Sequence, residues 1–217
     1  MIKNNKWKLA AGSLVILLPL LAGLILWGKL PERMPMHWGI DGQVDGWGSR
    51  TTAVLVMPLV LLGLHWLCVL LTAADPLNRR QSGKAVGMVL WICPALSLLM
   101  GAVTYCSTFG MTMNVDKLAL IFMGLAFVIM GNYLPKCRRN YSIGIKVPWA
   151  LNDEQNWNAT HRFAGRLWVG GGAGILLMAF LPWRELAFVL SFTLLIIMAA
   201  ASALYSYLYY RKHGQSQ

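Results

Sequence analysis

Six long apolar runs alternate with polar segments along the 217-residue chain. The runs cover about residues 9–28, 52–73, 85–106, 117–134, 166–182 and 186–209. A helix needs about 20 mostly apolar residues to cross the hydrocarbon core of a bilayer, and each run reaches or approaches that length. The pattern therefore predicts an all-α membrane protein, a bundle of six transmembrane helices.

Composition points to the same class of protein. The chain is 57% hydrophobic and only 12% charged, whereas charged residues make up about 25% of a typical soluble domain. The first apolar run follows a basic start, as in a signal peptide. It is longer than a typical signal-peptide core and no small-x-small cleavage pattern precedes Lys29, so we expect it to be retained as the first span.

The distribution of basic residues predicts the orientation. With the amino terminus inside, 14 of the 19 Lys and Arg residues fall in inner segments. An excess of Lys and Arg marks the cytoplasmic side of a membrane protein. We therefore expect a multi-pass protein of the bacterial inner membrane with both termini in the cytoplasm. Its net charge of +11 then needs no nucleic acid, because basic flanks and anionic lipid account for it.

Two polar segments are long enough to carry function. The outer segment 29–51 is rich in turn formers, and Pro31 and Pro35 argue against a continuous helix there. Its Trp38 and Trp47 are expected at the outer membrane interface. The inner segment 135–165 mixes basic and aromatic residues and is longer than a simple helix connection requires.

The second half of the inner segment has a helical pattern. Asn152 is expected as the helix N-cap, with acidic residues in the first turn. From there Trp157, His161 and Trp168 recur on one face. We expect a short amphipathic helix that lies at the inner membrane surface and turns into the fifth span near Gly165.

Three stretches of this region carry a family resemblance. They are Gly131–Lys136 (GNYLPK), Asn140–Trp149 (NYSIGIKVPW), and Asn156-Trp157 followed by Thr160–Arg162 (THR). Their order and content resemble the signature of the SdpI family. One departure is Lys146-Val147, where the family usually has Arg-Thr; the charge is kept and the threonine hydroxyl is absent.

The outer segment 29–51 also resembles the amino-terminal module that is often fused to this family. The two resemblances together imply two modules. Residues 1–84 would form an amino-terminal module of two transmembrane helices with the outer loop. Residues 85–217 would form an SdpI-like module of four transmembrane helices with the cytoplasmic loop 135–165.

The resemblance implies a function based on binding. It implies an integral membrane immunity protein that gives resistance to a secreted, membrane-active toxic peptide. It further implies a receptor that captures a small cytoplasmic transcriptional repressor. The expected partners are the lipid bilayer, the toxic peptide outside and the repressor inside, and no enzymatic activity, cofactor or metal is expected.

The candidate partner-binding residues lie in the cytoplasmic loop. Surfaces that mix Arg, Tyr and Trp favour protein contact, although basic residues here also serve topology and attract anionic lipid. The set comprises Arg138, Arg139, Asn140, Tyr141, Gly144, Lys146, Pro148, Trp149, Trp157, His161 and Arg162.

The candidate outer residues are His37, Trp38, Asp45 and Trp47. Through the two tryptophans they offer a docking site for the toxin. The alternative is a solvated turn, because Asp and Gly readily form turns. His37 with Asp41 and Asp45 matches no zinc or calcium spacing.

Two other functions stay open. A small transporter or exporter would need polar residues in several spans, and His65 is the main ionisable one there. A lipid-modifying membrane enzyme would use Glu154, His161 and Arg162 at the cytoplasmic surface. No motif of a serine hydrolase, zinc protease or P-loop enzyme occurs.

Two further patterns concern packing. The GxxxG pair Gly170 and Gly174 predicts close helix packing in the fifth span, with dimerisation as the alternative. The four cysteines have no CxxC spacing, so we expect neither a structural disulfide nor a metal site.

Overall fold

The computed structural model describes residues 2–81 and 83–213, and most of them are helical. The chain divides into two compact units. Unit 1 comprises residues 1–73 and 87–116, and unit 2 comprises residues 74–86 and 117–217. This division assigns most of the third long helix to unit 1, whereas the modules expected from the sequence, 1–84 and 85–217, separate it from the first two helices.

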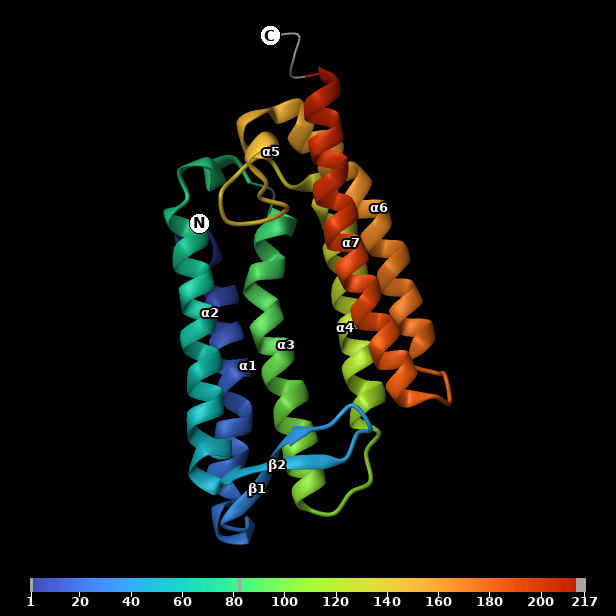
Figure 1. Ribbon diagram of the computed structural model, residues 1–217. Helices are drawn as coiled ribbons and strands as arrows, with labels where there is room; N and C mark the ends of the chain where they lie inside the picture. The colour runs from blue at the N-terminus through green and yellow to red at the C-terminus, as the bar shows by residue number, and fades with distance from the viewer. Residues whose placement is uncertain (1, 82, 214–217) are drawn as a thin grey trace. The chain divides into compact units, whose positions relative to one another are not determined.

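Unit 1 contains three long helices and a β-hairpin (Figure 1). The helices are α1 (Lys6–Ile25), α2 (Met57–Ala74) and α3 (Gly83–Thr108, of which the part from Gly87 onward belongs to this unit). Side-chain hydroxyls tie α3 to α1: Ser97 donates to the carbonyl of Ile16 at 2.9 Å and Tyr105 to that of Pro19 at 2.6 Å.

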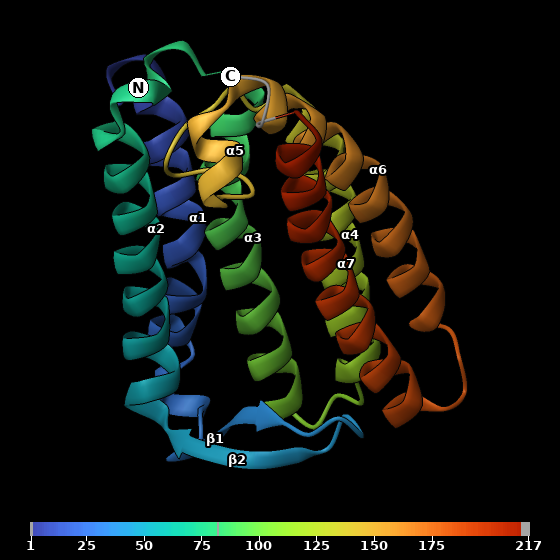
Figure 2. The same ribbon diagram turned by 45° about the horizontal axis from the view of Figure 1, so that its top comes forward.

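The outer segment forms an antiparallel hairpin instead of an irregular loop, so the protein is not all-α. Strand β1 (Arg33–Trp38) pairs with β2 (Val44–Ser49), and Figure 2 shows the pair crossing the end of the unit 1 helices. Gly42 adopts a φ of 77° in the connecting turn, a conformation that favours glycine. The carboxylate of Asp41 accepts the N–H of Gln43 and closes this turn.

Arg50 fastens the hairpin to α1. Its guanidinium Nη1 donates to the carbonyls of Trp27 at 2.8 Å and Leu30 at 3.0 Å, just beyond the end of that helix. The guanidinium also lies 4.5 Å from the centre of the Trp27 ring. One charged side chain thus satisfies two carbonyls at a helix end and makes a cation–π contact.

Unit 2 contains α4 (Val115–Tyr133, in this unit from Lys117), α5 (Pro148–Asn152), α6 (Glu154–Met178) and α7 (Arg184–His213). The three long helices run side by side in both ribbon views (Figures 1 and 2). Leu120 of α4, Ile175 of α6 and Ala187 of α7 meet in one buried cluster.

Helix α6 differs from the sequence expectation. It continues without a break through Gly165, so no separate amphipathic helix precedes the expected span 166–182. Its N-cap is Asp153 instead of Asn152, and the Asp153 carboxylate accepts the N–H of Gln155 at 2.8 Å. Asn152 instead ends the short helix α5.

The close packing of α6 uses other glycines than the expected GxxxG pair. A Cβ on Gly172 would lie 2.8 Å from the carbonyl oxygen of Gly124, and one on Gly165 would lie 2.9 Å from that of Gly131. The two pairs are spaced seven residues apart on both α4 and α6. Gly170 has no such neighbour within 4 Å, so it does not mediate packing.

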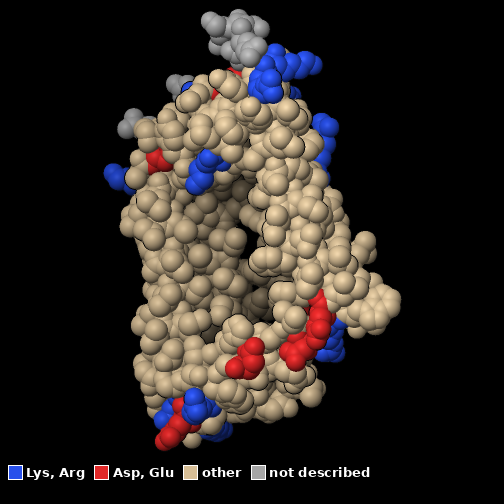
Figure 3. All heavy atoms as spheres, in the orientation of Figure 1, with Lys and Arg blue, Asp and Glu red and all other residues tan. Residues whose placement is uncertain are grey.

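Five helical segments of the described chain are long and apolar enough to cross a membrane. They are Lys3–Ile25, Thr52–Ala74, Ala85–Thr108, Val115–Lys136 and Arg184–His213. Helix α6 is not among them, because its first half is polar. Figure 3 shows the flanks of the long helices without charged side chains over most of their length, with Lys, Arg, Asp and Glu gathered towards the helix ends.

Candidate functional site

The segment 134–153 of unit 2 has little regular structure, and Asn140 holds it in shape. This residue is fully buried. Its amide nitrogen donates to the carbonyls of Arg138 at 2.7 Å and Ile143 at 2.9 Å. Its amide oxygen accepts the N–H groups of Ser142 and Ile143. Both N–H groups of the Asn140 amide and both lone pairs of its oxygen are therefore hydrogen-bonded within the loop.

Trp157 and His161 connect this segment to α6 by hydrogen bonds. Both lie buried on α6, and their rings stack with centroids 3.9 Å apart. The indole N–H of Trp157 donates to the carbonyl of Cys137 at 2.8 Å. The imidazole Nε2 of His161 accepts the N–H of Ile145 at 3.1 Å. The beginning and the middle of the segment are thus each bonded to α6.

The bonds of His161 define its protonation state. Its Nδ1 lies 2.8 Å from the carbonyl oxygen of Trp157, which can only accept, so Nδ1 carries the proton. Burial lowers the pKa of His161 to about 4, although the Trp157 carbonyl acts in the opposite direction. The residue is therefore neutral at physiological pH.

Gly144 must be glycine for two reasons. Its φ of 113° is a conformation that other residues rarely adopt. A Cβ at this position would also collide with Nε2 of His161. This close approach is what allows the next N–H, that of Ile145, to reach the imidazole.

Asp75 connects a second polar segment of unit 2 to the same loop. Its buried carboxylate accepts the N–H of Tyr141 at 2.7 Å and the hydroxyl of Ser142 at 3.0 Å. It also accepts the N–H of Leu77 at 2.9 Å and so caps the short 3-10 helix Pro76–Arg80.

Gln81 makes a further bond between these segments. Its amide oxygen accepts the N–H of Arg138 at 3.0 Å, and its amide nitrogen donates to the carbonyl of the same residue at 3.1 Å. The side-chain amide of Gln81 thus bonds to both the N–H and the carbonyl of Arg138, as the backbone of a paired β-strand residue does. Residues 75–81 fix the position of Arg138 and Tyr141 at two points.

Buried polar residues join α6 to α7 next to the loop. Asn156 donates to the carbonyl of Ser206 at 3.0 Å and accepts from the Ser206 hydroxyl at 2.7 Å. Thr160 donates to the Asn156 side chain at 2.9 Å. Both Asn156 and Thr160 are fully buried on α6.

The expected partner-binding residues therefore separate into three groups by burial. Asn140, Trp157 and His161 are buried and hold the segment together. Gly144, Arg139 and Trp149 are partly buried; the guanidinium of Arg139 donates to the Leu151 carbonyl at 3.2 Å and Trp149 packs on Tyr207. The exposed members are Arg138, Tyr141, Lys146, Pro148 and Arg162.

The outer residues are brought together by the hairpin. His37 and Asp45 lie on opposite strands, and the imidazole Nδ1 contacts the carboxylate at 2.5 Å. Both side chains are largely exposed, 74% and 53%. Trp47 is 55% exposed on β2, whereas Trp38 at the end of β1 is partly buried.

Two observations concern metal binding and cysteine chemistry in the part of the chain that the structure describes. Among the described residues, no three His, Cys, Asp or Glu side chains come close enough to hold a metal ion. Burial raises the pKa of the Cys137 thiol to about 11, so this cysteine stays protonated. The arrangement of segment 134–153 suits binding through exposed side chains on a rigid base.

Several residues that shape the site were missed from the sequence. They are Asp75, Gln81, Asn156, Thr160, Ser206 and also Asn78, whose side-chain amide donates to the hydroxyl of Ser142. One signal was available: Asp75-Pro76 is a typical N-cap followed by proline at the first helical position. Nothing local indicates that Asp75 would bond to a loop 66 residues further along the chain.

The fold and the apolar helices define a multi-pass α-helical membrane protein. Within that class, residues 136–209 match the SdpI/YfhL protein family, which confirms the resemblance drawn from the motifs. Residues 14–62 match a domain of unknown function (DUF1648), and this stretch includes β1 and β2.

One relative is similar along nearly its whole length. The chain is 27% identical over 208 residues to the "Immunity protein SdpI" of Bacillus subtilis (strain 168). The aligned region covers 94% of this chain and 96% of that protein. No solved structure matches the chain.

Proposed function

We propose that this protein gives a bacterium immunity to a secreted, membrane-active toxic peptide, and that it acts by binding and not by chemistry. The observation that carries the proposal is the extent of the similarity to the Bacillus subtilis immunity protein, 94% of this chain and 96% of the relative. The hairpin lies within the matched stretch 14–62. Residues 136–153 of the segment 134–153 lie within the matched stretch 136–209.

In this proposal α6 is the sixth membrane-crossing helix. Because the first half of α6 is polar, the crossing part is the expected run 166–182, whose 17 residues are at the lower limit of the range of about 17–25 that a transmembrane helix needs. The second half of α6 packs on α4 through Gly165 and Gly172. Six crossings place both termini on one side, and the bias of 14 in 19 basic residues makes that side the cytoplasm.

The cytoplasmic docking surface consists of the exposed residues Arg138, Tyr141, Lys146, Pro148 and Arg162. Tyr141 is 58% exposed although its own N–H is fixed by the buried carboxylate of Asp75. A side chain on a fixed backbone loses little conformational entropy when it binds. The three cations suit an acidic surface on a small repressor protein.

The hairpin is the toxin-facing element of the proposal. Trp47 offers a large exposed aromatic surface, and the pair His37 and Asp45 lies on the adjoining strands. Trp38 at the end of β1 adds partly buried aromatic surface. Aromatic side chains of this kind contribute strongly to protein contacts.

A growth assay tests the immunity function directly. A toxin-sensitive bacterium expressing this chain is challenged with a panel of membrane-active peptides. We expect selective survival that is lost in the variant with Trp47→Ala and His37→Ala. The matched control is Trp183→Ala, an exposed tryptophan of unit 2 in the connection before α7.

The outcome separates immunity from the cytoplasmic role. Two results together support immunity carried by the hairpin, with a separate docking surface. Survival is lost in the hairpin variant, and it is kept in the variant with Arg138→Ala and Tyr141→Ala. Loss of repressor capture in the second variant, at unchanged membrane levels, supports that surface. An absence of protection from every peptide, despite normal insertion, contradicts the immunity proposal.

A further inference from the structure

His65 lies inside the bundle of unit 1 without hydrogen-bond partners. The residue is on α2 and is 0% exposed. Neither ring nitrogen has a partner among the described residues, and the same holds for the buried hydroxyl oxygen of Ser13 on α1. A neutral imidazole has one donor and one acceptor, and leaving both unmet in an apolar bundle is costly.

A third polar group points to the same place. A Cβ built on Gly12 would lie 3.7 Å from Cε1 of His65 and 3.3 Å from the carbonyl oxygen of Leu90. Pro94 follows Leu90 by four residues in α3 and has no N–H, so the Leu90 carbonyl lacks its helical donor. The imidazole and a carbonyl without its helical donor thus converge on Gly12, and Ser13 is the next residue of α1.

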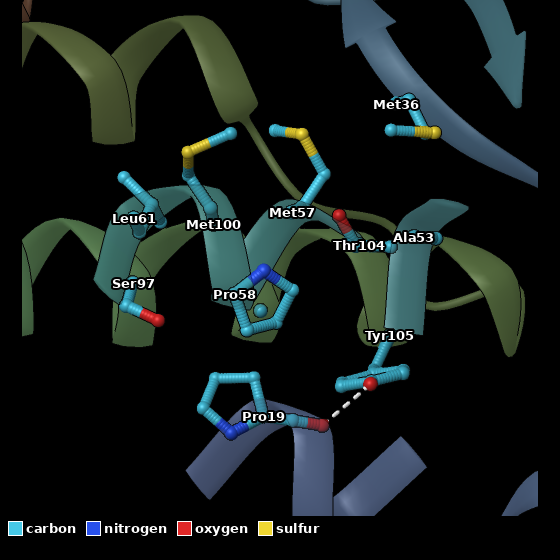
Figure 4. Close-up of a pocket in the computed structure, with 11 residues that line it drawn as sticks. Pro19, Met36, Ala53, Met57, Pro58, Leu61, Ser97, Met100, Thr104 and Tyr105 are labelled. Atoms are coloured by element: carbon cyan, nitrogen blue, oxygen red, sulfur yellow. Dashed lines mark hydrogen bonds between the residues drawn. The ribbon is translucent and has the colours of Figure 1, made fainter. Parts of the chain in front are cut away.

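A small cavity lies in the same helix bundle, about one helical turn from His65 and Pro94, and none of His65, Ser13 and Leu90 lines it. It lies between α1, α2, α3 and β1, with a volume of about 30 Å³. A buried water needs roughly 10–15 Å³ of such space, so this cavity has room for one or two waters near the polar groups. Leu61 lines the cavity one helical turn before His65, and Ser97 lines it one turn after Pro94 (Figure 4).

We propose that His65, the Ser13 hydroxyl and the Leu90 carbonyl form a water-binding site inside the transmembrane bundle of unit 1. Water suits this set because it both donates and accepts, and the set includes donors and acceptors on three helices. The groups are neutral or able to stay neutral, and no carboxylate is part of the set. The site joins α1, α2 and α3 through bridging hydrogen bonds, independently of the immunity proposal.

The test is water-to-imidazole magnetisation transfer in the full-length protein. The chain, labelled with ¹⁵N at histidine, is reconstituted in lipid bilayers and studied by proton-detected solid-state NMR. The His65 signal is assigned by its loss in His65→Gln. We expect transfer from water to the His65 imidazole in the wild-type protein, with the exposed His37 ring as the positive reference.

Two glycine variants make the test specific. Gly12→Ala places a methyl group at the point where the polar groups converge, and we expect it to reduce the transfer at least twofold. Gly63→Ala on α2, where a Cβ would meet nothing within 4 Å, is the matched control and should leave the transfer unchanged. A wild-type His65 ring that shows no transfer, or equal transfer in both variants, overturns the proposal.

A stability measurement covers the case in which Gly12→Ala does not fold. The Ser13→Ala change removes one of the groups that water would bridge. We expect a lower thermal midpoint, because the water and its other partners lose a hydrogen bond. A higher midpoint would mean that the hydroxyl is simply unpaired, and it would overturn the proposal.

Discussion

The backbone N–H of Ile145 donates a hydrogen bond to Nε2 of His161 at 3.1 Å. Because Nδ1 of the same ring donates to the Trp157 carbonyl, the imidazole bridges the irregular loop and helix α6 only while it is neutral. A second ring proton would sit on Nε2 and face the N–H of Ile145. The two motif stretches that contain Gly144-Ile145 and Thr160–Arg162 are thus joined by a bond that depends on protonation.

This bond predicts a loss of stability in acid. The pKa of His161 is lowered by burial to about 4 in the folded protein, from 6.5 in the unfolded chain. The unfolded chain therefore binds the proton first, so stability is full above pH 6.5 and falls between pH 6.5 and about 4. The expected total is about 3 kcal/mol.

Thermal unfolding in detergent between pH 4 and 8 measures this effect. Because carboxylates also titrate near pH 4, the informative quantity is the difference between the wild-type protein and His161→Gln. We expect the variant to be less stable at pH 7.5 and to lose less stability on acidification. Parallel pH profiles for the two proteins would contradict the assignment of the effect to His161.

The Asp75 carboxylate predicts a second measurable effect. Replacing it by alanine leaves the N–H of Tyr141 and the hydroxyl of Ser142 without their acceptor. Removing one partner from a buried hydrogen bond costs about 1–3 kcal/mol. We expect a lower unfolding midpoint for Asp75→Ala and faster proteolysis after Arg138 and Arg139, which flank the released loop.

Asp41→Ala is the control for this change. Asp41 likewise accepts a backbone N–H, that of Gln43, but at an exposed turn. Its loss should change the midpoint little, because water replaces the bond. Equal midpoints for the two variants would show that the Asp75 carboxylate does not hold the loop.

Arg50 gives a prediction for unit 1. Arg50→Met keeps much of the apolar stem but removes the donors to the Trp27 and Leu30 carbonyls. We expect a destabilisation of about 1–3 kcal/mol from the lost charged hydrogen bonds. Arg33→Met is the control, since Arg33 is exposed on the same hairpin. A denaturant titration followed by tryptophan fluorescence compares them, and an equal effect of both changes would contradict the anchoring role of Arg50.

The sequence predicted most of the helical architecture because long apolar runs carry that information directly. Five expected spans are found at nearly the expected positions. The hairpin was missed because β1 contains Pro35 and β2 contains Gly46 and Gly48, residues that weaken strand propensity. The pairing itself explains Gly46, because a Cβ at this position would collide with the side chain of His37 on the opposite strand.

The residues proposed from the sequence for the candidate site were given one common role, whereas the structure buries some of them and exposes others. Exposure cannot be read from residue type, so buried His161 and exposed Arg162 were grouped together. The helix break expected at Gly165 is absent because this glycine packs against Pro135 and the Gly131 backbone. The glycine serves helix packing there, which a local pattern does not distinguish from a helix end.

Helix packing through glycine predicts a contrast between two neighbouring positions on α6. A Cβ on Gly172 would lie 2.7 Å from the Val128 nitrogen and 2.8 Å from the Gly124 oxygen, both backbone atoms. Gly172→Ala should therefore force α4 and α6 apart and lower stability by about 1–3 kcal/mol. Gly170→Ala adds a methyl group in open space and should be neutral, or stabilising by up to about 1 kcal/mol through helix propensity. Thermal unfolding of the two variants in the same detergent decides the matter, and a larger loss at Gly170 would restore the GxxxG interpretation.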